Sequence, residues 1–185
     1  MSMTQAGPMV RVESGVLCGA THEGLHVFRG IPYAAPPFGA NRFQQPVRPE
    51  SWDGVRHATR SGVAAPQPAT APRDPWAPMY APTNTGEDCL TLDVWTPELG
   101  ATGLPVVVHI HGGGYMTGAG SLPLYSGRAF ARDGIVHVSI NYRLGIEGFL
   151  YLGDEHDSLG LRDQIAALEW VQRNIAAFGG NPDRV

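Results

Sequence analysis

Several short stretches of the chain predict β-strands from the order of their apolar and polar residues. Residues 9–12 and 25–28 are extended runs separated by glycines, which predicts an amino-terminal hairpin or small meander. Residues 90–95 alternate and are rich in strand-forming side chains. Residues 106–110 and 135–140 are predominantly apolar, a pattern typical of strands that are buried on both faces of a sheet.

After Gly160 the apolar spacing changes from the period of a strand to that of a helix. Steps of three and four predict one buried stripe, made of Leu161, Ile165, Leu168, Val171, Ile175 and Phe178. Asp157 or Ser158 is the expected amino-terminal cap. Asp163 is expected in the first turn, and residues 179–180, both glycine, mark the end of the helix.

Strand, glycine loop, strand and helix follow one another in the order typical of an α/β sheet, which is the predicted fold class. A right-handed crossover through the helix returns the chain to a further parallel strand, expected to begin near Val185. The length of 185 residues suits one domain. Between residues 32 and 82 prolines recur every few positions, and this predicts a long surface excursion without regular ladders.

The composition and charge of the chain limit which classes of binding partner are expected. The net charge is −4, and the 13 basic residues, all arginine, are scattered, so neither nucleic acid nor an anionic membrane is an expected partner. Residues 1–15 lack the regions of a signal peptide, and no apolar run approaches the ~18 residues of a membrane span, which predicts a cytoplasmic protein. Cys18 and Cys89 match no metal-ligand spacing, and neither a metal nor a cofactor is expected.

Three consecutive glycines, residues 112–114, directly follow the predicted strand 106–110. Without side chains, their amide groups can converge on one negatively charged oxygen. The triplet therefore fits an oxyanion hole, although a flexible or phosphate-binding loop is the alternative. The glycine patterns of nucleotide-binding loops are absent from the sequence. His109 and His111 could also share a metal, but the sequence places no third ligand beside them.

The segments around this triplet resemble the type-B carboxylesterase family of α/β-hydrolases, which includes para-nitrobenzyl esterases and cholinesterases. The resemblance implies an incomplete α/β-hydrolase fold, with residues 1–185 as the amino-terminal part of one domain. The matching blocks are residues 28–34 (FRGIPYA), 87–95 (EDCLTLDVW), 111–115 (HGGGY), 141–145 (NYRLG), 160–164 (GLRDQ) and 174–182 (NIAAFGGNP).

The resemblance also implies roles for individual residues. The amides of Gly113 and Gly114 would supply two donors of an oxyanion hole for a small-molecule ester. Tyr115 would face the acyl side of the substrate gorge, and Trp76 would line its mouth. Ion pairs are implied between Arg42 and Glu87 and between Arg143 and Asp163.

No serine in the chain lies within the nucleophile pattern Gly-x-Ser-x-Gly. The resemblance places the nucleophile, the acid and the catalytic histidine beyond Val185, so the chain alone is predicted to be inactive. A separate carboxy-terminal chain that complements it is then a candidate partner. The alternative hypotheses are a non-catalytic cholinesterase-like binding module and a nonfunctional truncated remnant.

Overall fold

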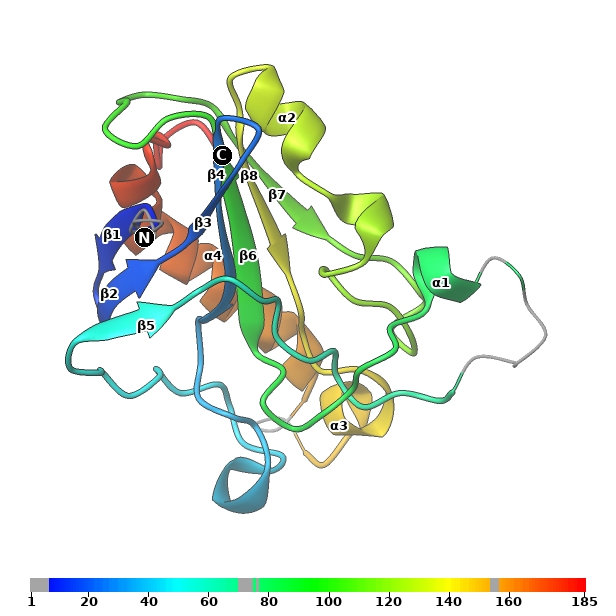
Figure 1. Cartoon of the computed structure of the whole chain (residues 1–185). Helices are drawn as coiled ribbons and strands as arrows, with labels where there is room; N and C mark the ends of the chain where they lie inside the picture. The colour runs from blue at the N-terminus through cyan, green and yellow to red at the C-terminus, as the bar shows by residue number, and fades with distance from the viewer. Residues whose placement is uncertain (1–6, 70–74, 76, 154–156) are drawn as a thin grey trace, which may run out of the picture.

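The computed structural model describes residues 7–69, 75, 77–153 and 157–185, and its largest element is a five-stranded mixed sheet (Figure 1). Its strand order is β3-β4-β6-β8-β7, in which β7 and β8 are parallel and the other pairs are antiparallel. The strands are β3 (Ala20–His22), β4 (Leu25–Pro32), β6 (Thr91–Thr96), β7 (Val106–Ile110) and β8 (Val136–Ile140). The strands predicted at residues 25–28, 90–95, 106–110 and 135–140 are thereby confirmed.

The runs at residues 9–12 and 25–28, predicted to form one hairpin or small meander, lie in different sheets, and a second, smaller sheet contains the first of them. β1 (Met9–Val12) is antiparallel to β2 (Gly15–Cys18), and β5 (Val55–His57) adds to β2 in parallel. β5 lies inside the proline-rich excursion, where no ladder was expected. Its three residues include no proline, so they keep the backbone donors that a ladder requires.

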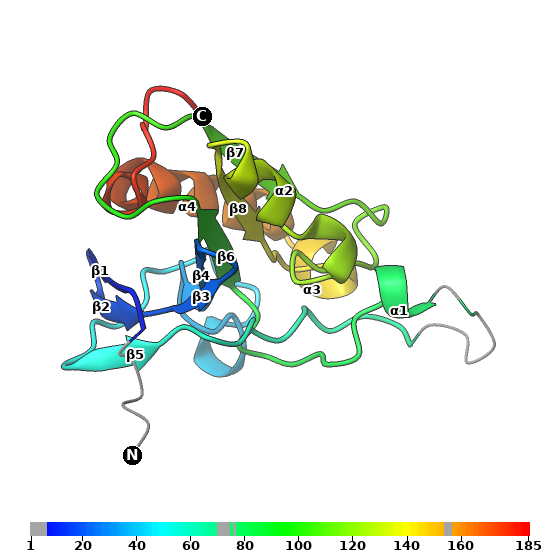
Figure 2. The same cartoon turned by 45° about the horizontal axis from the view of Figure 1, so that its top comes forward.

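The helix predicted after Gly160 is confirmed as α4 (Leu159–Asn174), which continues into η4 (Ile175–Phe178). α4 runs along one face of the large sheet, and α2 (Arg128–Arg132) lies on the other (Figures 1 and 2). The other helical segments among the described residues are α1 (Ala77–Tyr80), α3 (Gly145–Phe149), η1 (Gly39–Asn41) and η2 (Pro123–Tyr125). None of the described helices combines the length and apolar character that a membrane span needs.

The face of α4 that packs on the sheet differs from the predicted stripe. Leu161, Ile165 and Leu168 are 40%, 56% and 37% exposed, so their predicted burial was wrong. The buried positions are Leu159, Gly160, Asp163, Ala167, Trp170, Val171 and Asn174. These residues also recur at helical spacing, but several are small or polar, which hides the stripe from a hydrophobicity pattern.

The start of α4 also corrects two expectations. Ser158 occupies the cap position, but its hydroxyl donates to the Asp157 carboxylate (3.0 Å) and makes no capping bond to the helix. Asp163 lies in the second turn and is fully buried. The carboxylate is therefore placed by a partner inside the fold and not by the positive end of the helix.

The chain after η4 returns to the free side of β7, as the crossover argument predicts. Leu104 N donates to Gly179 O (3.1 Å), and Asn181 N donates to Leu104 O (2.8 Å). Val106 N then donates to Arg184 O (2.9 Å). The bridge between Leu104 and Gly180 is parallel, so the final residues run in the direction of β7.

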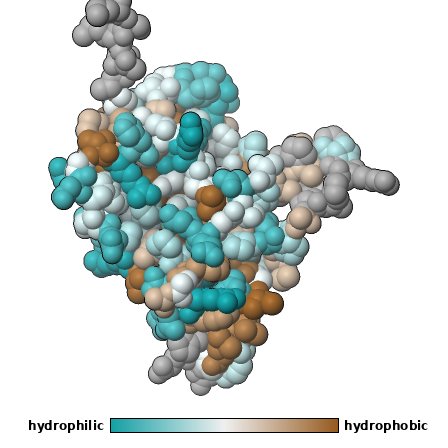
Figure 3. Space-filling view, turned by 60° about the horizontal axis from the view of Figure 1, so that its bottom comes forward, coloured by the Kyte–Doolittle hydropathy of each residue, from teal (hydrophilic) through white to brown (hydrophobic). Residues whose placement is uncertain are grey.

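Apolar side chains reach the surface at the α3 end of the molecule, which Figure 3 brings forward as brown surface. Ile146 on α3 is 66% exposed, and Leu150 and Leu152, just after it, are 41% and 47% exposed. By contrast, the core between the sheet and α4 is closed, with Phe28, Trp170 and Phe178 in contact through their rings.

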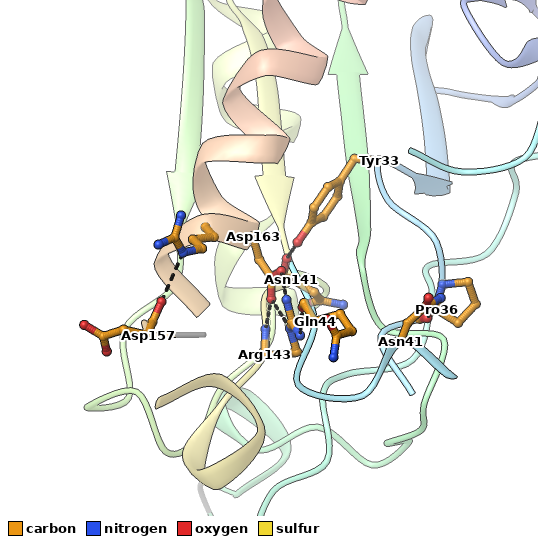
Figure 4. A network of polar contacts seen from close by, with 9 residues as sticks. Tyr33, Pro36, Asn41, Gln44, Asn141, Arg143, Asp157 and Asp163 are labelled. Carbon is orange, nitrogen blue, oxygen red and sulfur yellow. Dashed lines mark hydrogen bonds and ion pairs between the residues drawn. The ribbon is translucent and has the colours of Figure 1, made fainter. Parts of the chain in front are cut away.

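The polar connection between β8 and α4 is the buried pair Arg143–Asp163 (Figure 4). Nε of Arg143 donates to Oδ2 of Asp163 (2.8 Å), and Nη2 donates to Oδ1 (2.7 Å). Arg143 Nη1 also donates to Gln44 O (2.8 Å), which connects the excursion to the same point. The pair implied by the resemblance is thus confirmed.

The second implied pair is not formed as expected. Arg42 donates to Glu147 of α3, with Nη2–Oε1 at 2.5 Å and Nε–Oε2 at 3.1 Å, and not to Glu87. The Arg42 side chain is 53% exposed and turns toward α3, a placement that depends on the fold of the excursion. Glu87 acts on Arg42 only as a more distant charge.

Replacing Asp163 by asparagine is predicted to lower the free energy of unfolding by about 3–5 kcal/mol, because the buried Arg143 loses its counter-charge. Glu147→Gln, which weakens an exposed pair, is predicted to cost about 1 kcal/mol or less. Urea-induced unfolding measures both. A loss in Asp163→Asn no larger than that in Glu147→Gln would contradict the structural role of the buried pair.

Candidate active site

The three-glycine loop follows the carboxyl end of β7, next to the carboxyl end of its parallel neighbour β8. Ligands of α/β sheets bind at this edge, beyond the carboxyl ends of parallel strands. The loop 111–115 from β7 and the segment 141–145 from β8 therefore meet at the edge where a site is expected. The sequence predicted the loop, and the strand pairing supplies its neighbour.

The loop is closed by hydrogen bonds to the carbonyl of Gly113. Met116 N and Thr117 N donate to Gly113 O at 3.1 and 3.2 Å. Gly113 has a φ of +118°, and a Cβ at this position would overlap the carbonyl oxygen of Thr117. Only glycine fits this turn without displacing the backbone.

The amide groups of Gly113 and Gly114 take no part in this closure. Within the part of the chain that the structure describes, neither amide donates a hydrogen bond. A fixed backbone donor without a protein partner is available to an oxygen atom that gains negative charge. An amide without a protein partner is one of the properties that an oxyanion hole requires.

A surface pocket of about 250 Å³ adjoins this loop, and Gly114, Tyr115, Tyr142 and Gln164 lie on its wall. Tyr115 is 52% exposed and has a φ of +61°, a left-handed conformation that is unusual for tyrosine. Its carbonyl accepts from Gly145 N (2.7 Å), and its ring lies 4.7 Å from the ring of Phe149. The structure thus brings Tyr115 and Gly114 to one pocket.

His111, which precedes the glycines, is held by its neighbours. Its ring stacks on Tyr142 at 4.5 Å, and Tyr142 Oη donates to His111 O (2.8 Å). Nδ1 lies 2.9 Å from Gly112 O, a hydrogen bond when that nitrogen carries the proton. Burial lowers the pKa of His111, which favours the neutral form of the ring.

The comparisons with known proteins agree on one family. The sequence profile of the "Carboxylesterase family" matches residues 6–185. The chain belongs to the carboxylesterase family. It is 47% identical over 180 residues to the phenmedipham hydrolase of Pseudarthrobacter oxydans, an alignment that covers 96% of this chain and 36% of that protein. It is 45% identical to the para-nitrobenzyl esterase of Bacillus subtilis (strain 168), over 96% of this chain and 37% of that enzyme.

Solved carboxylesterase structures have the same fold. The Geobacillus stearothermophilus carboxylesterase EST55 superposes with a TM-score of 0.85 and 43% identity, over 95% of this chain and 36% of that one. The fold is therefore that of the α/β-hydrolases, as the resemblance implied. The chain spans about 36% of the length of these carboxylesterases.

One further prediction, for Trp76, and one alternative, a metal shared by His109 and His111, remain to be compared with the structure of this carboxylesterase chain. Trp76, expected at the mouth of the gorge, lies outside the described residues. His109 and His111 do not share a site: the ring of His109 lies 4.2 Å from Tyr125, whereas His111 stacks on Tyr142. Within residues 7–69, 75, 77–153 and 157–185, no group of three or more metal-ligating side chains is placed to hold an ion.

Asn141 is a site-supporting residue to which the sequence analysis assigned no role. Its Oδ1 accepts from Gly120 N (2.8 Å), and its Nδ2 donates to Val63 O (3.1 Å). It thereby ties the end of β8 to the segment after the glycine loop and to the excursion. The available signal was a polar side chain directly after an apolar strand, inside the matching block 141–145.

His137 of β8 is a buried histidine on the sheet face that α2 covers. It stacks on Phe130 at 5.0 Å and lies 6.2 Å from His109. Its Nδ1 is buried without a hydrogen-bond partner among the described residues. Burial, and secondarily His109, lower the pKa of His137 from 6.5 to about 4. The folded protein therefore holds this ring neutral.

Stability is predicted to fall as the pH decreases from 6.5 to about 4, because the unfolded chain then binds a proton that the folded His137 does not. The loss is about 3 kcal/mol or less. Urea unfolding across this range should show a weaker pH dependence in His137→Phe. His57→Phe, at an exposed position of β5, is the control. Equal slopes in the two variants would contradict the assignment.

Proposed function

We propose that this carboxylesterase-family chain forms the oxyanion-binding part of a serine carboxylic-ester hydrolase. The unpaired amides of Gly113 and Gly114 are the observation that carries the proposal. The carbonyl oxygen of a small-molecule ester gains negative charge when its carbon is attacked. Two fixed amides beside it would stabilise that charge more strongly in the transition state than in the ground state.

The reaction needs a nucleophile that this sequence does not contain in its usual pattern. In the proposed reaction a serine oxygen from the carboxy-terminal part of the enzyme attacks the ester carbonyl carbon, and a histidine of the same part takes the serine proton. The histidine passes this proton to the leaving alcohol and then assists the attack of water that hydrolyses the acyl-enzyme. No cofactor, metal, nucleic acid or membrane takes part in this proposal.

Tyr115 is proposed to position the acyl group of the ester. Its position on the wall of the pocket, next to Gly114, supports this role. The Gly145 amide holds its carbonyl, and Phe149 contacts its ring, so the side chain has a defined direction despite its exposure. Trp76 is proposed to line the entrance, on the family resemblance alone.

A hybrid enzyme tests the proposal, with residues 1–185 joined to the part of the Bacillus subtilis para-nitrobenzyl esterase that lies beyond the matched segment. The hybrid is predicted to hydrolyse para-nitrophenyl acetate, whereas the 185-residue chain alone is predicted to be inactive. Gly113→Ala is predicted to lower kcat of the hybrid by about 100-fold or more, because the added Cβ displaces the donor amide.

Gly134→Ala is the matched control. Gly134 lies between α2 and β8 with a φ of +80°, and a Cβ there meets no atom within 4 Å. Gly134→Ala therefore introduces the backbone strain of an alanine at a positive φ but leaves the glycine loop unchanged. A kcat for Gly113→Ala equal to that for Gly134→Ala would refute the oxyanion role. A folded hybrid without turnover would favour the non-catalytic binding module instead.

A further inference from the structure

One side chain of the proline-rich excursion binds the end of the glycine loop. The Gln67 carboxamide accepts from Gly118 N through Oε1 (2.8 Å) and donates to Gly118 O through Nε2 (2.8 Å). Nε2 also donates to Ala65 O (3.0 Å). A planar amide that is both donor and acceptor thus fixes both backbone groups of one residue, 51 positions along the chain.

Gly118 lies in close contact with the residues that begin the loop. Its φ is +115°, and a Cβ on it would overlap His111 Nδ1 and Gly112 O. The end of the loop is therefore packed against its beginning, and the turn that carries Gly113 is held between the two. Within the described part of the chain, only Gln67 and the Gly145 amide make hydrogen bonds to residues 113–118 from outside the loop.

The segment that carries Gln67 is itself anchored. Ala64 N donates to Asn84 O (3.0 Å), and Gly86 N donates to Ala64 O (2.9 Å). Ala64 is buried in one cluster with Ala119, which follows Gly118 directly. The carboxamide of Gln67 is therefore attached to a backbone that is fixed three residues earlier, at Ala64.

We propose that Gln67 is a positioning residue that orients the amides of Gly113 and Gly114, an inference that rests on the proposed oxyanion role. The clamp on Gly118 fixes the turn through a residue outside the donor pair, so both donors stay free. Small displacements of reacting groups are costly in catalysis, and a loosened loop would stabilise the transition state less well while binding the ground-state ester unchanged.

Gln67→Glu tests this inference, since a carboxylate cannot donate to Gly118 O and repels it. In the hybrid enzyme we expect kcat for para-nitrophenyl acetate to fall about tenfold and KM to change less than about twofold. In the 185-residue chain we expect exchange of the hydrogen-bonded amides of residues 116–118 to accelerate about tenfold. Gln172→Glu is the matched control, because Gln172 is exposed and donates to Pro182 O (2.8 Å) away from the loop.

The outcomes separate this inference from the proposed function. Kinetics and exchange equal to those of Gln172→Glu would overturn the role of Gln67 and leave the oxyanion proposal intact. Faster exchange in a folded hybrid that lacks turnover would overturn the proposed function and retain the clamp. If Gln67→Glu does not melt cooperatively, Gln67→Met, which keeps the length and removes the three bonds, is measured in its place with the same expected results.

Discussion

The loop after β7 has to be held in one conformation by hydrogen bonds that leave the amides of Gly113 and Gly114 unpaired. Backbone amides normally find partners inside the protein, and buried amides without them are costly. Here the loop is fixed through its carbonyls and through its last residue: Gly113 O, Tyr115 O and both backbone groups of Gly118. Because Gly113 and Gly114 are both exposed, water can solvate their free amides until a ligand replaces it.

The rest of the fold supplies the points to which this loop is fixed. Parallel pairing of β7 and β8 brings their carboxyl ends together, and Asn141 and Tyr142, just after β8, bind the residues on either side of the glycines. Arg143 then fixes the same segment to α4 through Asp163. The Arg143–Asp163 pair fixes the backbone directly beside the site, and this position accounts for a charged pair inside the core.

The sequence predicts those parts of the fold that depend on local order. The apolar runs gave β6, β7 and β8 to within one residue at each end, and the helix α4 follows from its period. The packed face of α4 could not be predicted in this way, because its partners lie earlier in the chain. Asp163 is bound by Arg143, 20 residues earlier, and Gly160 lies against the ring of Phe149 and the carbonyl of Arg143, 11 and 17 residues earlier. A hydrophobicity pattern scores such positions as solvent-facing.

In the candidate site, too, residues within one sequence block could be predicted and residues that act over long separations could not. The glycines and Tyr115 could be identified because they form one contiguous block, whereas Gln67 and the Glu147 partner of Arg42 act over 51 and 105 positions. Nothing local to Gln67 distinguishes it from other polar residues of a proline-rich loop. Its role follows only when the fold places the excursion against the loop after β7.

The most direct test is the structure of the hybrid enzyme after reaction with a phosphonate ester, whose phosphonyl oxygen mimics the oxyanion. We expect this oxygen to lie about 2.7–3.1 Å from the amide nitrogens of both Gly113 and Gly114. A phosphonyl oxygen directed away from both amides, with these amides bonded instead to carbonyl groups of the protein, would contradict it.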